Sequence, residues 1–275
     1  IETAYECGRL DLFDEILPGL PLKNPLSEQA KLLYALLLKK EGRIDAAKNA
    51  LKELISSEKN SEPISSQLQP IIERALLEQI ALEYDSMSWK TCTELARSFL
   101  KKKPNQNPSA WHLLASSSSR LAQQHKDDLS YTQELVHDLE SLLQYSELFS
   151  TNEQAEWKFL LAKGHYDLKQ FDQAESLLLE LEKTGSLNAN GNLLLGLCYR
   201  EGLGDETAFC LYAEKALEQH ADLIDAGHLS LSLFNAYLNL SKKAPELTER
   251  AAEYLLSAFE TGVEISPDNL FWLAA

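Results

Sequence analysis

The sequence predicts an all-α protein, an α-solenoid built from about six helix-turn-helix hairpins. Leu and Ala are plentiful and runs of β-branched residues are nearly absent, which argues against strands. The 275 residues include only 11 Gly and 9 Pro, so strands joined by frequent tight turns are disfavoured. Apolar residues recur at helical spacing, and no convincing strand-like alternation interrupts them. We expect one array over residues 1–275, as a fragment of a longer protein.

The first predicted hairpin lies before residue 57. Ser27-Glu28 can cap a helix that continues through Lys40, and Gly42-Arg43 supplies the turn into a second amphipathic helix. Ala35 and Ala47 are small residues on the two helices, as close packing requires. A polar loop with Pro63 is expected from Ser57 to Ser66.

The sequence between Trp89 and Phe149 predicts two further hairpins. A helix from Trp89 carries Cys92 at its small position and ends before Pro104, where Lys101-Lys102-Lys103 complements the negative end of the helix dipole. Asn107-Pro108-Ser109 opens the next helix. An insertion from Gln123 to Ser130 then precedes a long helix that ends near Phe149.

The clearest repeat unit runs from Glu156 to Lys183, after a capping sequence that starts at Ser150. Two amphipathic helices meet at the polar turn Lys169-Gln170. Ala162 lies midway along the first helix and Ala174 near the start of the second. Helices in a hairpin pack closely only where small side chains allow it, so this pair of alanines is a packing requirement.

This unit resembles the tetratricopeptide repeat, whose second helix opens with aromatic-Asp-Glu-Ala, as in Phe171-Asp172-Gln173-Ala174. The resemblance implies a right-handed α-solenoid. Residues Leu195 to Gly204, followed by Tyr212 to Leu217, resemble a Sel-one-like repeat, a close relative with a Gly-x-Gly turn. We expect Gly202 and Gly204 to allow positive φ angles there. Some spacings between small positions exceed the 34-residue period of the family, so we expect irregular hairpins.

Composition disfavours several function classes. The formal net charge of -16 repels phosphate backbones, so nucleic-acid binding is not expected. No apolar stretch approaches the ~20 residues that span a bilayer. No catalytic motif, phosphate-binding glycine loop or cofactor site is recognisable, and we expect no enzyme. His125 beside Asp127 and Asp128 is interpreted as a solvated loop in preference to a metal site.

The four cysteines form no CxxC pair. Cys198 and Cys210 fall on the two helices of one hairpin, so a disulfide is an alternative, but buried free thiols in a reducing compartment are favoured. We therefore expect a cytoplasmic protein. A periplasmic or envelope-associated one is the alternative if a signal peptide has been removed.

The resemblance also implies a binding surface. First helices of tetratricopeptide hairpins line a concave groove, and matching positions after and before each small residue point into it. The principal candidates are His112, Ser116, Ser119, Arg120, Phe159, Lys163, Tyr166 and Arg200. Further matching positions are Leu36, Lys39, Lys40, Asp167, Leu197 and Glu201.

These positions predict a protein-interaction scaffold that holds a partner peptide or helix. The run Ser116 to Ser119 is expected to form a small, polar groove floor. Recurring Lys and Arg suggest an acidic partner, although plain solvation of these cations is weighed equally.

Two alternatives to a peptide-binding groove stay open. One is a self-assembling structural module, a homo-oligomer formed through terminal helices such as the apolar end Leu270 to Leu273. The other is an accessory domain of a larger secretion, envelope or regulatory protein.

Overall fold

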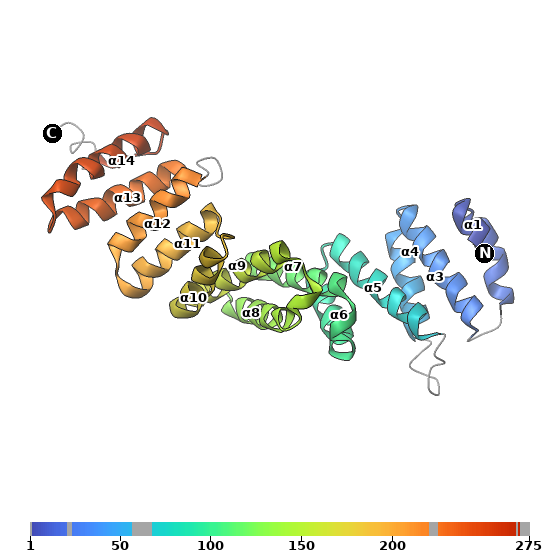
Figure 1. Ribbon diagram of the computed structural model, residues 1–275. Coiled ribbons are helices and arrows are strands. Elements are labelled where there is room, and N and C mark those ends of the chain that lie inside the picture. Colours follow the sequence, from blue (N-terminus) through green and yellow to red (C-terminus); the bar gives the residue numbers. More distant parts are fainter. Residues whose placement is uncertain (1, 21–23, 57–67, 220–224, 268, 270–275) are drawn as a thin grey trace. The chain divides into compact units, whose positions relative to one another are not determined.

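The computed structural model describes residues 2–20, 24–56, 68–219, 225–267 and 269 (Figure 1). Every regular element within these ranges is helical, and none of them is a strand. The chain divides into two compact units, Ile1–Lys126 and Asp127–Ala275. The prediction of an all-α fold is confirmed.

The first unit consists of helices that pack on their sequence neighbours. Its elements are α1 (Glu2–Glu6), α2 (Leu10–Ile16), η1 (Leu17–Gly19), α3 (Pro25–Lys40), α4 (Ile44–Ser56), α5 (Gln69–Asp85), α6 (Trp89–Lys102), η2 (Pro104–Gln106) and α7 (Pro108–Gln124). Helices α3 and α4 form one hairpin and α5 and α6 the next, while α7 packs on α6. The predicted loop from Ser57 to Ser66 lies outside the described residues.

The second unit repeats the same pairing. Its elements are α8 (Leu129–Leu143), η3 (Ser146–Leu148), α9 (Thr151–Asp167), α10 (Phe171–Lys183), α11 (Ala189–Cys198), η4 (Tyr199–Leu203), α12 (Glu206–Gln219), α13 (Ala226–Ser241), η5 (Pro245–Leu247) and α14 (Thr248–Glu260). Helix α8 packs on α9, and the pairs α9/α10, α11/α12 and α13/α14 form hairpins (Figure 1).

The boundary between the units falls inside one predicted hairpin. Helix α7 belongs to the first unit and α8 to the second, so a single array over the whole chain stays a prediction. Helix α8 also ends at Leu143, earlier than the expected end near Phe149. The Tyr145 amide donates to the Leu142 carbonyl at 2.9 Å, and this tighter bond replaces α-helical spacing before η3 begins.

Capping by nearby side chains explains where helices α9 and α3 begin. Ser150 and Glu153 form the expected capping box at α9, with each side chain accepting a backbone N–H of the other residue. At α3, however, the cap is Asn24 and not Ser27, because Pro25 occupies the first turn and Asn24 Oδ1 accepts from the Leu26 amide at 2.9 Å. The Ser27 hydroxyl donates to the Asn24 carbonyl instead.

Small residues lie where paired helices cross, as the sequence predicts. Ala162 and Ala174 are both 0 % exposed and share one core cluster with Leu178 and Leu195. In the next hairpin, a methyl group added at Gly196 would lie 3.2 Å from the Phe209 carbonyl oxygen of α12. The two helices therefore approach closely at this position, and there is little room for a side chain.

The two glycines of the η4 turn have different roles. Gly204 has a φ of +68°, in the left-handed region that favours glycine, as expected. Gly202 does not have a positive φ, so that part of the expectation is wrong. Its constraint is steric, because an added Cβ would lie 2.8 Å from the Cβ atom of Phe171 in the preceding hairpin.

We predict that Gly202→Ala lowers the free energy of unfolding by about 1–2 kcal/mol, the usual cost of an overpacked contact. The loss should shrink by half or more in a Phe171→Ala background, since the clash is then removed. Urea denaturation of the four proteins of this double-mutant cycle measures both values.

Gly19→Ala is the matched control for this cycle. A Cβ at Gly19 meets nothing within 4 Å, so its stability should be unchanged. If Gly202→Ala lowers the free energy of unfolding equally with Phe171 and with Ala at position 171, the steric explanation is wrong.

Candidate partner-binding surface

The candidate residues of α7 differ in exposure along the helix. His112, Ser116 and Ser119 are half-buried and Arg120 is exposed. Ser117 is 0 % exposed, and its Oγ lies 2.7 Å from the Leu113 carbonyl oxygen and 3.0 Å from Cys92 Sγ of α6. The expected floor of four serines is therefore wrong for Ser117 and Ser118, which are buried.

The candidate residues of α9 form one stripe. Phe159, Lys163 and Tyr166 follow each other at the three- and four-residue spacing that places side chains on one helix face. Phe159 packs against the core cluster of its hairpin, while Lys163 is exposed. The structure thus brings the α9 candidates together.

Tyr166 connects this stripe to the next hairpin. Its ring meets Phe171 edge-on, with centroids 5.6 Å apart. Its hydroxyl bonds to the Glu201 carboxylate, and burial together with this bond raises the pKa of Tyr166. Candidate positions from two successive hairpins, Tyr166 and Glu201, are therefore in contact.

Two of the expected groove cations have partners within the chain. The Arg200 guanidinium lies 4.1 Å from the centroid of the Phe209 ring, and Nη1 donates to Ser232 Oγ at 3.2 Å. Lys39 Nζ lies 3.1 Å from a Glu78 carboxylate oxygen. Lys40 and Lys163 are exposed, but they lie in different units. This arrangement weakens the case for a basic lining.

Sequence reasoning missed a polar cluster around Glu214 of α12. One carboxylate oxygen of Glu214 accepts from the Tyr237 hydroxyl at 2.6 Å and from the Tyr254 hydroxyl at 2.9 Å. The same oxygen accepts from Arg250 Nε at 2.9 Å, and the two tyrosine rings stack with centroids 5.8 Å apart. Burial raises the pKa of Tyr254 to about 12, together with the hydrogen bond to the Glu214 carboxylate and its negative charge. No sequence motif signals the cluster, because its members are far apart in the chain.

A pocket of about 340 Å³ lies between the start of α9 and the turn that joins α10 to α11. Its lining residues are Asn152, Ala155, Glu156, Phe159, Leu181, Gly185, Ser186, Leu187 and Asn188. Phe159 is the only member of the predicted site among them. The sequence gives no signal for the pocket, since it depends on how two separate turns meet.

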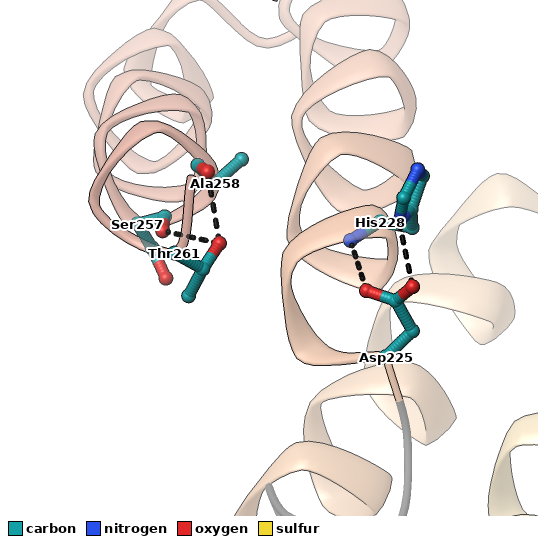
Figure 2. A network of polar contacts seen from close by, with 5 residues as sticks. All are labelled: Asp225, His228, Ser257, Ala258 and Thr261. Atoms are coloured by element: carbon teal, nitrogen blue, oxygen red, sulfur yellow. Dashed lines mark hydrogen bonds and ion pairs between the residues drawn. The ribbon is translucent and has the colours of Figure 1, made fainter. Parts of the chain in front are cut away.

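The chemistry of the described residues offers no metal centre. No cluster of three or more His, Cys, Asp or Glu side chains suited to a metal ion occurs among them, and this includes the His125 loop. The contact of His228 Nδ1 with Asp225 at 2.7 Å is an exposed pair at the start of α13 (Figure 2). Asp225 also caps this helix by accepting from the His228 amide, and these bonds lower the pKa of Asp225.

The four cysteines are free thiols, so the disulfide alternative for Cys198 and Cys210 is not realised. Cys7 is exposed and the other three are buried. Burial raises the pKa of both Cys198 and Cys210 to about 12. None of the described helices is both long and apolar enough to cross a membrane.

We predict that Ellman's reagent at pH 8 reacts quickly with one thiol per chain, Cys7, and with the other three only after unfolding. A pKa of about 12 leaves only about one thiolate in ten thousand at that pH for Cys198 and Cys210. Burial also raises the pKa of the Cys92 thiol, and it blocks access of the reagent to all three. A total of two thiols after denaturation without reductant would show that Cys198 and Cys210 are bridged.

Comparison with known proteins gives similarity in structure alone. No family model and no curated protein matches the sequence. Among solved structures, the C-terminal part of a TPR repeat-containing protein from Cytophaga hutchinsonii matches with a TM-score of 0.56 and 10% identity, over 99% of this chain and 97% of that one. YrrB, described as a TPR protein with an unusual peptide-binding site, matches with a TM-score of 0.53 and 13% identity, over 76% of this chain and 93% of that one. A chain of the Naa15/Naa10 complex bound to HypK-THB matches with a TM-score of 0.55 and 16% identity, over 95% of this chain but 38% of that one. The chain therefore has the tetratricopeptide-like helical-repeat fold.

Proposed function

We propose that this chain is a non-catalytic interaction scaffold that binds a segment of a partner protein along the first helices of its hairpins. The observation that carries the proposal is the stripe of Phe159, Lys163 and Tyr166 along one face of α9. The Tyr166 ring also contacts Phe171 of α10 and its hydroxyl lies beside the Glu201 carboxylate of η4. The exposed side chain of Lys163 lies one helical turn from Tyr166 on the same stripe. Repeat arrays commonly bind partners on such extended surfaces.

The fold supports this proposal but does not identify the partner. The description of YrrB mentions a peptide-binding site, and that of the Naa15/Naa10 structure mentions bound HypK-THB. A short partner segment, extended or helical, is the kind of ligand that an array of helices can hold. An acidic partner remains a prediction that rests on Lys40 and Lys163, since Lys39 and Arg200 have internal partners.

We predict that a photo-crosslinking amino acid at position 163 captures the partner in cells that produce the chain. The Lys163 side chain is exposed, so the replacement leaves the core unchanged. Mass spectrometry of the crosslinked peptides then identifies both the partner and the segment that lies on α9.

Position 183 provides the matched control, because Lys183 is an exposed lysine of α10, the second helix of the same hairpin. The same crosslinker there should capture the partner at a small fraction of the yield. Equal yields at both positions, or capture at 183 alone, would contradict the assignment of the binding surface to first helices.

Self-association is a second candidate, favoured by the exposed apolar residues of α14. Leu256 is 48% exposed and Phe259 is 54% exposed, and their spacing places them on one face of the helix. If this face joins two copies of the chain, Leu256→Glu with Phe259→Glu should convert a dimer to a monomer in light scattering over a concentration series. A parent chain that is monomeric throughout the series would rule this candidate out.

A further inference from the structure

The pocket beside α9 continues the proposed binding surface. Asn152, Glu156 and Phe159 line the pocket, and their spacing places them on one face of α9. Lys163 and Tyr166 extend the same stripe. A partner segment that lies along this stripe therefore passes the mouth of the pocket. Its volume of about 340 Å³ is at the small end of the ~300–1,000 Å³ range of ligand pockets, which suits a single side chain.

The pocket has an apolar floor and a polar rim. Leu181 is buried, and Ala155, Phe159 and Leu187 pack partly buried against the same core cluster. The exposed lining residues form the rim, and these are Asn152, Glu156, Gly185, Ser186 and Asn188. Such a division fits a side chain with a long apolar stem and a charged end, which is the form of Arg and Lys.

The negative charge at the rim of the pocket favours a bound side chain whose end carries a positive charge. Glu156 is the only lining residue with a formal charge, and its side chain is exposed. Phe159 adds an aromatic ring, and aromatic faces attract guanidinium and ammonium groups.

Two helix N-termini near the pocket could instead attract an anion. Each already has a side-chain acceptor for one amide of its first turn. At α9 the Glu153 amide donates to Ser150 Oγ, and at α11 the Gly191 amide donates to Asn188 Oδ1 at 2.9 Å. The full charge of Glu156 therefore outweighs the partial charges of the capped helix ends.

We propose that this pocket is a specificity site for an arginine or lysine side chain of the bound partner. The stem of that side chain lies on the apolar floor, and its cationic group meets the Glu156 carboxylate and the Phe159 ring. The proposal rests on the proposed function for its biological meaning. Its chemistry is testable without the partner.

The test is a titration of the full 275-residue chain with the tripeptide acetyl-Ala-Arg-Ala-amide, followed by the backbone amide signals in NMR spectra. We expect saturable shifts at Gly185, Ser186 and Asn188 in the millimolar range. The same tripeptide with citrulline, a neutral isostere of arginine, should bind about three- to fivefold more weakly, as loss of a partly exposed ion pair predicts. A glutamate tripeptide should not bind.

Glu156→Gln is the decisive variant, because Glu156 is exposed and its replacement leaves the core intact. It should weaken arginine binding by the same three- to fivefold and abolish the preference for arginine over citrulline. Glu253→Gln, at an exposed position of α14 in the same unit, is the control and should bind like the parent chain.

Equal binding of the arginine and citrulline tripeptides to the parent chain would overturn the inference. Absence of shifts at the pocket, or tighter binding of the glutamate tripeptide, would also overturn it. These results are independent of crosslinking at position 163, which tests the proposed function. If crosslinking succeeds and the tripeptides fail, the scaffold stands and the basic-side-chain site does not.

Discussion

The close approach of the two helices of each hairpin is the constraint from which the binding surface follows. Ala162 and Ala174 have no exposed surface, and at Gly196 there is almost no space for a methyl group. Ala162 packs in the core of the α9–α10 hairpin, and Phe159 and Tyr166, three residues before it and four after it, lie on a neighbouring part of the same helix face and are partly buried against the same cluster. Lys163 follows Ala162 directly, is turned further from the core and is exposed. The packing of the hairpin therefore also determines how far each side chain of the proposed surface is exposed.

Contacts between successive hairpins follow a repeating plan in the second unit. Glu182 of α10 accepts from the Tyr212 hydroxyl and from Lys215 Nζ of α12. One hairpin later, Glu214 of α12 accepts from the Tyr254 hydroxyl and from Arg250 of α14. In each case a glutamate on a second helix binds one tyrosine and one cation on the next second helix. The tyrosine hydrogen bonds in these clusters are partly buried, and such bonds to a charged group contribute about 1.5–3 kcal/mol each. The ion pairs of Lys215 and Arg250 are more exposed and contribute less. The clusters therefore stabilise the stacking of hairpins in addition to the apolar core.

The features that the sequence could predict are those that depend on neighbouring residues. The capping box of Ser150 and Glu153 is local, and so is the pair of small residues on either side of the α9–α10 turn. Gly202 was interpreted wrongly because its real constraint is Phe171, more than thirty residues away in the sequence. The Glu214 cluster and the pocket next to Phe159 escaped prediction for the same reason. Ser117 was misplaced because helical spacing alone does not show which of four adjacent serines faces a neighbouring helix such as α6.

Many lysine and arginine side chains are paired with glutamates of the same chain, and this affects which charge a partner should carry. Lys48, Lys103 and Lys158 join Lys39, Lys215 and Arg250 in ion pairs with glutamates of neighbouring helices. The chain has 42 acidic and 26 basic residues. Each internal ion pair removes one of each, so the ratio of acidic to basic residues among the unpaired ones rises. Screening at physiological salt confines the effect of these charges to about 8 Å, which limits long-range attraction. A carboxylate that acts at such short range discriminates between partners only where the surface also holds the incoming group in place. Glu156, at the rim of a pocket with an apolar floor, meets that condition.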